Sequence, residues 1–289
     1  MKLHTKQTVK HQRWNGTAAL TAAMMAVLLL IVPVSGDRPN VRTRQPTRDP
    51  FAAMVEANRD AVLAVGTYGF KDTPTGQYYG TGFVVGDGNI VATNEHVISA
   101  IRKKKKLDQL TLFLPGQRPG RGRPAKLIGQ DKFHDVAILR FAGPSIKPLT
   151  LDMKGRPAQG QTVGIIGYPI GMHLGVVPAA HKGVIAAIVP AVRPLPKGTK
   201  LTPELAKTIQ HPYQFYQLDL VVYPGNSGSP LFDVQTGKVL GVINKTLAAK
   251  TREHLLTNPS GIAYAVQIRW VDELITRYRK SVTAKEIRP

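Results

Sequence analysis

Twelve short apolar runs, each bounded by glycine, proline or polar turn residues, constrain the fold of this chain more than any other feature. They form two groups of six, separated by the proline- and glycine-spaced segment 143–161. Short runs rich in valine, isoleucine and aromatic residues, with turn signals between them, are typical of antiparallel β-structure. Gly86-Asp87-Gly88 and Gln235-Thr236-Gly237 have the composition of hairpin turns. The first group covers 61–68, 77–85, 89–93, 109–116, 125–130 and 136–142, and the second covers 162–169, 182–189, 215–222, 229–234, 238–247 and 261–268.

We therefore expect an all-β fold of two packed six-stranded antiparallel β-barrels, the first at about 61–142 and the second at about 162–268. A short helix is expected after Pro50, with Phe51, Met54 and Val55 on one side. A final helix is predicted by one apolar stripe, and we expect it to dock on the second barrel. The stripe consists of Val271, Leu274, Ile275 and Tyr278.

The N-terminus has the pattern of an export segment. Residues 1–16 contain four basic residues and no acid, and an apolar run follows at 17–34. A basic head, an apolar middle and small residues at the end are typical of a signal peptide, predicted here at 1–36. The run is also long enough to span a bilayer, so an uncleaved membrane anchor is an open alternative. Both interpretations place the rest of the chain outside the cytoplasm.

The chain is strongly basic, with a formal net charge of +21. Removal of residues 1–36 takes away four basic residues, which leaves 35 − 18 = +17. Nine Lys and Arg residues lie within 101–126, against the single acid Asp108. The segment is interpreted either as a solvated loop or as a contact for an anionic membrane or cell-wall surface. Nucleic acid is a poor candidate partner, because only one aromatic residue, Phe113, is interleaved with these charges.

The stretch "YPGNSGSPLFD" (223–233) places Ser227 between glycines in a tight turn that leads into an apolar run. Such a turn is either structural or presents a nucleophile, and a nucleophilic serine needs a base and an orienting acid from elsewhere. His96 ends the stretch "IVATNEHV", where a strand is expected to pass into a polar turn, and Asp135 immediately precedes the apolar run 136–142. His134 is a rival base, but neighbouring side chains should point to opposite faces.

The three contexts together, "TNEHV", "DVAIL" and "GNSGSPL" in that order, resemble the chymotrypsin-fold serine peptidases, and most closely their exported HtrA (Deg) branch. The resemblance covers 51–280, the predicted peptidase domain, and includes "GYPIG" (167–171) and "GIAYAV" (261–266). It implies that Ser227 attacks the scissile carbonyl, that His96 is the general base, and that Asp135 orients His96. It further implies an oxyanion hole from the backbone N–H groups of Gly225 and Ser227.

The resemblance also places the floor of the substrate pocket at Val221, with further pocket-shaping positions near Asn244 and Thr246. An apolar floor disfavours Lys or Arg before the cut and favours small or medium aliphatic residues. Polypeptide substrates, a homotrimer formed through residues 37–60, and a periplasmic or secreted location are expected from the resemblance. It implies no cofactor. The Pro/Arg-rich stretch 37–50 is predicted as a linker and 281–289 as a basic tail, with no PDZ domain following.

Rival functions fit the sequence less well. An α/β-hydrolase esterase needs Gly-x-Ser-x-Gly and the triad order Ser, Asp, His. A metal hydrolase is disfavoured because the chain has no His-Glu-x-x-His motif and no cysteine. The alternative from another class is a non-catalytic or latent protein on the same fold, which acts as a chaperone-like or anionic-surface-binding module.

Overall fold

The computed structural model describes residues 48–69, 76–116, 122–169, 176–190, 213–244 and 261–286. The predicted signal or anchor at 1–36 and nearly all of the linker at 37–50 lie outside these residues. Every element below belongs to one compact unit, Thr47–Pro289.

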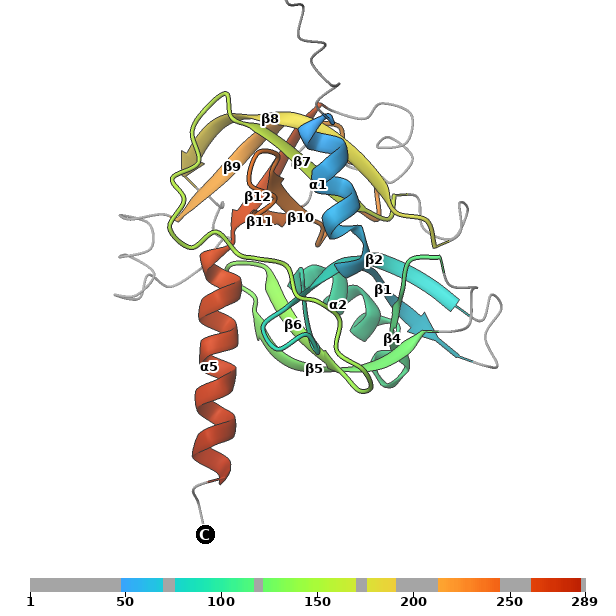
Figure 1. The fold of residues 1–289 in the computed structure, drawn as a ribbon. Coiled ribbons are helices and arrows are strands. Elements are labelled where there is room, and N and C mark those ends of the chain that lie inside the picture. Colours follow the sequence, from blue (N-terminus) through green and yellow to red (C-terminus); the bar gives the residue numbers. More distant parts are fainter. Residues whose placement is uncertain are drawn as a thin grey trace, which may run out of the picture. The chain divides into compact units, whose positions relative to one another are not determined.

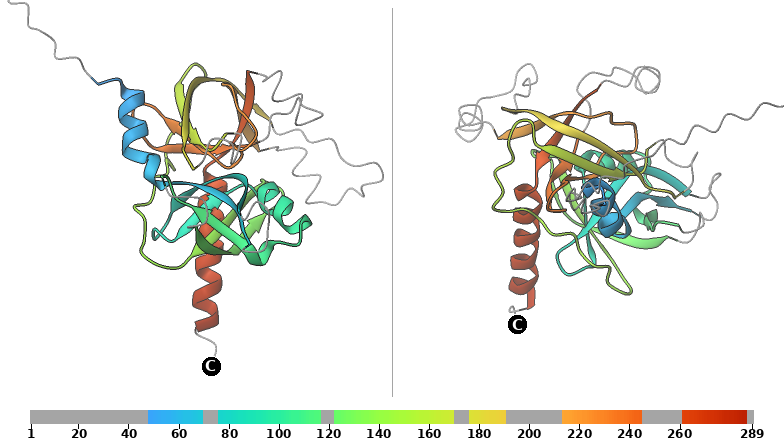
Figure 2. Two further views of the ribbon diagram at one scale, coloured as in Figure 1. Left: turned by 90° about the vertical axis from the view of Figure 1, so that its right-hand side faces the viewer. Right: turned by 45° about the horizontal axis from the view of Figure 1, so that its top comes forward.

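Two closed antiparallel barrels of six strands each make up the fold, as predicted (Figure 1). The first has the strand order β1-β2-β3-β6-β5-β4, and the second has the order β10-β11-β12-β9-β8-β7. The left view of Figure 2 shows the strands of the second barrel closing on themselves. The first barrel consists of β1 (Val62–Tyr68), β2 (Gly76–Val85), β3 (Ile90–Thr93), β4 (Leu110–Phe113), β5 (Arg123–Asp131) and β6 (Val136–Phe141). The second consists of β7 (Thr162–Gly167), β8 (Ala179–Pro190), β9 (Gln214–Asp219), β10 (Pro230–Asp233), β11 (Val239–Ile243) and β12 (Ile262–Gln267).

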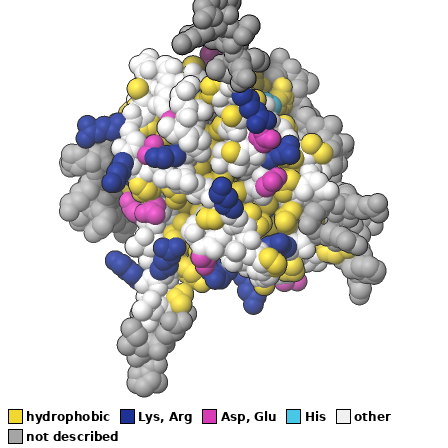
Figure 3. All heavy atoms as spheres, in the orientation of Figure 1, with side chains coloured by type: hydrophobic (Ala, Val, Ile, Leu, Met, Phe, Trp, Pro, Cys, Tyr) yellow, Lys and Arg dark blue, Asp and Glu magenta, His cyan; other side chains and the backbone are white. Residues whose placement is uncertain are grey.

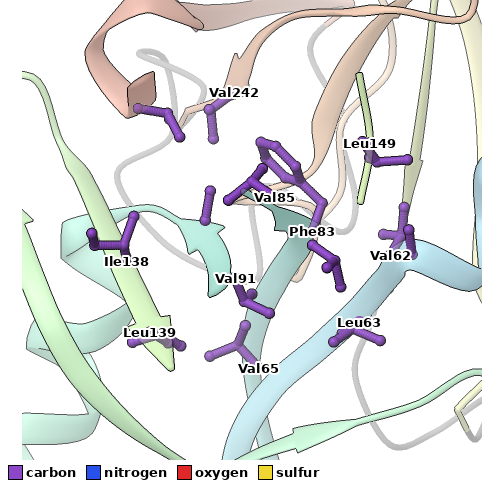
Figure 4. Packing of buried hydrophobic residues seen from close by; sticks show 14 of the residues in the cluster. Val62, Leu63, Val65, Phe83, Val85, Val91, Ile138, Leu139, Leu149 and Val242 are labelled. Atoms are coloured by element: carbon purple, nitrogen blue, oxygen red, sulfur yellow. The ribbon is translucent and has the colours of Figure 1, made fainter. Parts of the chain in front are cut away.

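The first barrel and the junction between the barrels share one apolar core. Figure 4 shows Val62, Val65, Phe83 and Val91 of the first barrel gathered with Val242 of the second. Each is fully buried, and full burial of such a side chain contributes about 1.5–3 kcal/mol. The barrels are therefore packed against each other by continuous apolar contact.

Each of the two terminal helices packs on the barrel that is not its neighbour in the sequence. Helix α1 (Pro50–Asn58) precedes the first barrel in sequence, yet Phe51 and Met54 pack on the second, because a Cβ built on Gly164 of β7 would lie 2.7 Å from an atom of each. A 3₁₀ turn, η1 (Arg59–Ala61), connects α1 to β1. Helix α5 (Arg269–Glu286) follows the second barrel but runs beside the first (Figure 1).

The predicted docking of the final helix on the second barrel is therefore wrong. Val271, Leu274 and Ile275 are buried, and a Cβ built on Gly129 of β5 would lie 3.4 Å from Leu274 Cδ1. The apolar stripe was identified correctly, but a stripe does not specify which apolar surface it meets.

Candidate active site

His96 lies in the first turn of a helix, α2 (Glu95–Lys103), where only a polar turn was expected. Val97, Ile98 and Ile101 of this helix are buried, whereas its last turn carries Arg102 and Lys103. A basic last turn matches the negative end of the helix dipole. The apolar spacing and the charge at the end of the segment were the missed helix signals. A second 3₁₀ turn, η2 (Leu107–Gln109), leads from α2 to β4.

His96 and Asp135 are joined by two hydrogen bonds. The backbone N–H of His96 donates to Asp135 Oδ1 at 2.8 Å, and His96 Nδ1 lies 2.7 Å from Asp135 Oδ2. The Asn94 side chain donates from Nδ2 to the Asp135 carbonyl oxygen at 3.0 Å. Asp135 has a left-handed backbone, with φ of 55°, which Asp and Asn tolerate better than most residues. The carboxylate thereby fixes the orientation of the ring and leaves the second ring nitrogen, Nε2, available to accept a proton.

Ser227 lies in a loop, residues 223–229, that we call the nucleophile loop. Gly225 and Gly228 have φ values of 103° and 89°, which are accessible to glycine at no steric cost. Asn226 and Gly228 are buried, while Gly225 and Ser227 are half-buried. The loop thus leaves the serine accessible and turns the chain back behind it.

The main-chain N–H groups of Gly225–Ser229, the part of the nucleophile loop around Ser227, divide into two sets. Those of Asn226, Gly228 and Ser229 donate to carbonyl oxygens at 3.0, 2.9 and 3.0 Å. Within the described residues, the N–H groups of Gly225 and Ser227 donate to no protein acceptor. Because backbone donors are seldom left unpaired inside proteins, these two N–H groups are available to an outside acceptor.

Gly80 lies between the histidine helix and the serine loop. A Cβ built on Gly80 would lie 2.7 Å from Val97 Cγ2 and 2.8 Å from the Ser227 carbonyl oxygen. The residue after His96 and the predicted nucleophile therefore lie on either side of one glycine. Among the described residues, no hydrogen bond joins the Ser227 hydroxyl to His96.

The predicted pocket residues lie at the end of β9 and the end of β11. Val221 is 37% exposed, while the alternate residues Leu220 and Val222 are buried in the second barrel. Asn244 is buried, and its N–H donates to the Tyr264 carbonyl oxygen at 2.8 Å. Because Thr246 lies outside the described residues, the pocket remains a prediction.

His134, the rival base, is held in a different cluster. Its Nδ1 lies 2.9 Å from Asp131 Oδ2, and its ring stacks on Trp270 at 3.5 Å between centroids and 14° between planes. Arg277 donates to the same Asp131 oxygen at 3.0 Å. Burial acts to raise the pKa of Asp131, but hydrogen bonds from the His134 ring, the His134 backbone and Arg277 together lower it. Thus α5 braces the turn that ends at Asp135.

Three supporting residues were not predicted from the sequence. Asn94 and Asp131 fix the backbone on either side of the His96–Asp135 pair, and Thr81 bonds to the nucleophile loop. Asn94 precedes a helix and Asp131 precedes a turn, positions that these residue types favour. For Thr81 the available signal was its place between two glycines, Gly80 and Gly82, which allow close backbone approach.

None of the cavities described among these residues is lined by a predicted catalytic residue. A groove lies between α1, residues 146–150 and the turn 234–238, but none of the predicted catalytic residues lines it. No group of three or more His, Asp or Glu residues in the described segments is placed to hold a metal ion. None of the described helices is long and apolar enough to cross a bilayer.

Two closed six-stranded antiparallel barrels in one chain define the chymotrypsin-like class of fold. A family model for the trypsin-like peptidase domain matches residues 80–242, more than half of the 289 residues. The chain belongs to this family.

Curated relatives agree with this assignment. A probable periplasmic serine endoprotease, DegP-like, from Halomonas elongata is 30% identical over 189 residues, which cover 65% of this chain and 32% of the relative. A protein of the same description from Hahella chejuensis is 29% identical over 192 residues, 66% of this chain and 34% of the relative. The chain thus spans about a third of the length of these relatives.

A solved structure has the same fold. It is an inactive serine-to-alanine mutant form of Rv3671c from M. tuberculosis H37Rv, with a TM-score of 0.55 and 21% identity. The match covers 78% of this chain and 90% of that chain.

Proposed function

We propose that this protein is a serine endopeptidase that uses Ser227 as nucleophile, His96 as general base and Asp135 as the orienting acid. The observation that carries the proposal is the pairing of two features. His96 is held by two hydrogen bonds to Asp135, one of them from its ring, and the N–H groups of Gly225 and Ser227, on either side of Asn226, donate to no acceptor within the described residues. Membership in the trypsin-like peptidase family supports the same activity.

The proposed reaction proceeds in two stages. The Ser227 hydroxyl gives its proton to His96 Nε2 and attacks the peptide carbonyl, which forms a tetrahedral intermediate. The N–H groups of Gly225 and Ser227 bind its oxyanion, and one such donor contributes about 3 kcal/mol of barrier reduction. His96 then protonates the leaving amine, and water hydrolyses the acyl-enzyme by the same route. Asp135 stabilises the protonated ring throughout.

Preference for small or medium aliphatic residues before the cut is proposed from Val221, whose exposed side chain between β9 and the nucleophile loop supports a role in the pocket. A cationic side chain would find no partner at an apolar floor. Peptides that differ only in alanine, valine or lysine at this position test the preference. Faster cleavage of the lysine peptide would contradict it.

Export to the periplasm or beyond is proposed from the N-terminal pattern and from the periplasmic description of the relatives. Unfolded or exposed polypeptides are the proposed substrates. A homotrimer through residues 37–60 is also proposed, although the α1 part of that segment packs on its own β7. Light scattering coupled to gel filtration measures the mass of the assembly, and a monomer would exclude the trimer.

Contact with an anionic surface through residues 101–126 is supported by one observation. Lys103, Lys104 and Lys105 are all exposed at the end of α2, and Lys103 lies seven residues, about 10 Å of helix, from His96. On the face seen in Figure 3, however, Lys and Arg side chains are spread among acidic ones. Salt-dependent binding to anionic vesicles, lost when the three lysines are changed to glutamine, tests the contact.

The test of the activity compares the full chain with its Ser227→Ala variant on unfolded casein and on a fluorophosphonate probe. Loss of this serine should abolish both reactions, since removal of a serine nucleophile costs roughly 2 × 10⁶ in kcat in subtilisin. Ser229→Ala is the matched control, a buried serine of the same loop, and should still be labelled. If the wild type neither cleaves nor is labelled, the non-catalytic binding module replaces the peptidase.

A further inference from the structure

All polar groups of Thr81 in β2 are hydrogen-bonded, and two of them, its N–H and its hydroxyl, bond to the nucleophile loop. Its N–H donates to the Ser227 carbonyl oxygen at 2.8 Å, and its hydroxyl donates to the Gly225 carbonyl oxygen at 2.7 Å. The same hydroxyl accepts from the Tyr168 N–H at 3.0 Å. Its carbonyl oxygen accepts from the Thr93 hydroxyl at 2.7 Å. A residue of the first barrel thus bonds to both residues of the proposed oxyanion hole.

The surroundings of Thr81 prevent it from moving away from the loop. Thr81 is completely buried. A Cβ on Gly228 would overlap the Thr81 carbonyl oxygen, and one on Gly80 would lie 2.8 Å from the Ser227 carbonyl oxygen. Glycines on both sides therefore let the two backbones lie in direct contact.

Tyr168 fixes the other side of the Thr81 hydroxyl. This residue follows β7 and is buried, and its own hydroxyl donates to the Val62 carbonyl oxygen at 2.9 Å. With an N–H donor on one side and a carbonyl acceptor on the other, the Thr81 hydroxyl has a fixed direction. Its proton can point only toward Gly225, because the Tyr168 N–H occupies the acceptor side.

Gly225 is the residue that most needs such a restraint. Glycine has the largest backbone freedom, and Gly225 must hold a φ of 103° for its N–H to remain available. Within the described residues, no other hydrogen bond to the Gly225 carbonyl oxygen is present. A hydrogen bond to this oxygen restricts rotation of Gly225 and so restricts the direction of its N–H.

We propose that Thr81 is a positioning residue for the oxyanion hole: its hydroxyl, supplied by the first barrel, holds Gly225 of the second barrel in the conformation that presents its N–H. This inference rests on the proposed function. Thr81 touches neither the substrate nor the reacting atoms, and it acts through Gly225. It should therefore affect the stabilisation of the transition state and leave the binding of the substrate nearly unchanged.

Three variants in the full chain separate the hydroxyl from the methyl group. Thr81→Ser keeps the hydroxyl and loses the methyl group, Thr81→Val keeps the methyl group and replaces the hydroxyl with a second one, and Thr81→Ala keeps neither. Thr111→Val is the matched control, a buried first-barrel threonine whose hydroxyl donates to the Gln109 carbonyl oxygen. The readouts are kcat and KM on a peptide substrate, the inhibition constant of a peptide aldehyde that forms an oxyanion on Ser227, and the melting temperature.

Thr81→Val and Thr81→Ala should lower kcat roughly 10- to 100-fold, less than the 10²–10³ found when an oxyanion donor is removed outright. The aldehyde should bind more weakly by a similar factor, with KM within about twofold. Thr81→Ser and Thr111→Val should stay close to wild type. If Thr81→Val fails to fold, the pair Thr81→Ser and Thr81→Ala still isolates the hydroxyl.

Two results would overturn the inference while the wild type remains active. In the first, Thr81→Ala and Thr81→Ser have equal kcat, so that the hydroxyl contributes nothing. In the second, KM rises as much as kcat falls while aldehyde affinity is unchanged, so that the defect lies in substrate binding. A wild type that neither cleaves nor is labelled removes the proposed function itself, and this inference with it.

Discussion

The two halves of the proposed active site are held by different kinds of bond. The His96–Asp135 half depends on side chains of a single barrel, with carboxylate oxygens at 2.8 and 2.7 Å from the histidine nitrogens. The Ser227 half is shaped mainly by the backbone: Gly228 N–H donates to the Ile243 carbonyl oxygen, and the loop receives bonds from the other barrel. The first half should therefore be most sensitive to a change in side-chain chemistry, and the second to added side-chain atoms.

The largest effect is expected from Asp135→Asn, which breaks the side-chain half. Asparagine tolerates the left-handed backbone at this position, but its amide stabilises the wrong histidine tautomer. We expect kcat to fall roughly 10⁴-fold with the fold intact, as measured on a peptide substrate and by thermal unfolding. A kcat close to wild type would show that Asp135 does not orient the base.

Gly228→Ala breaks the backbone half by adding one methyl group. The new Cβ overlaps the Thr81 carbonyl oxygen, and the residue keeps a φ of 89°. Displacement of the loop should cost at least the loss of one oxyanion donor, roughly 10²-fold in the rate of fluorophosphonate labelling.

The matched control for Gly228→Ala is Gly237→Ala. Gly237 also has positive φ, 67°, but the nearest neighbour of its added Cβ is the Asn58 amide nitrogen in α1, at 3.4 Å. It should lower stability by about 1–2 kcal/mol and leave labelling unchanged. Equal loss of labelling in both variants would mean that backbone strain alone, and not contact with Thr81, disables the loop.

Trp270→Ala tests the contact between α5 and the turn that ends at Asp135. Trp270 is half-buried and stacks on His134, so its loss should lower the free energy of unfolding by about 2–3 kcal/mol, somewhat below the cost for a fully buried tryptophan. Chemical denaturation measures the change, and Trp270→Phe should recover most of it. Equal stability of the alanine and phenylalanine variants would show that the ring contributes nothing.

The smallest effect concerns acid stability. Because the folded pKa of Asp131 is lowered, its contribution is complete above its unfolded pKa of about 3.9 and is lost as pH falls through the folded pKa. Asp131→Asn should therefore be less stable than wild type at pH 6, with the difference shrinking below about pH 4. Unfolding followed across pH 2.5–6 tests this, and a constant difference would exclude the linkage.

All twelve strands were predictable because each is a short apolar run closed by turn residues, a local signal. The helix that carries His96 was missed because it is short and because the polar stretch 93–96, between the apolar strand and Val97, has the composition of a turn. The partner of α5 was assigned wrongly because amphipathicity specifies a buried face and leaves its neighbour open.

Within the site, the proposed catalytic residues His96, Asp135 and Ser227 were identified from sequence motifs, whereas the residues that support them were not predicted. Thr81 and Ser227 are far apart in the sequence and meet only through barrel packing, which no local pattern encodes. The argument against His134 as the base, that its side chain should point away from that of Asp135, assumed the alternation of a strand. Residues 132–135 form a turn, where this alternation does not hold.

The positions of α1 and α5 have a consequence for the order in which the proposed active site is completed during synthesis. The turn that carries Asp135 belongs to the first barrel, yet its ring and ion-pair partners, Trp270 and Arg277, come from the last helix of the chain. Because synthesis runs from the N-terminus, the residues of the first barrel are made before this brace exists. A chain truncated before α5 would keep all three proposed catalytic residues and lack the support for one of them.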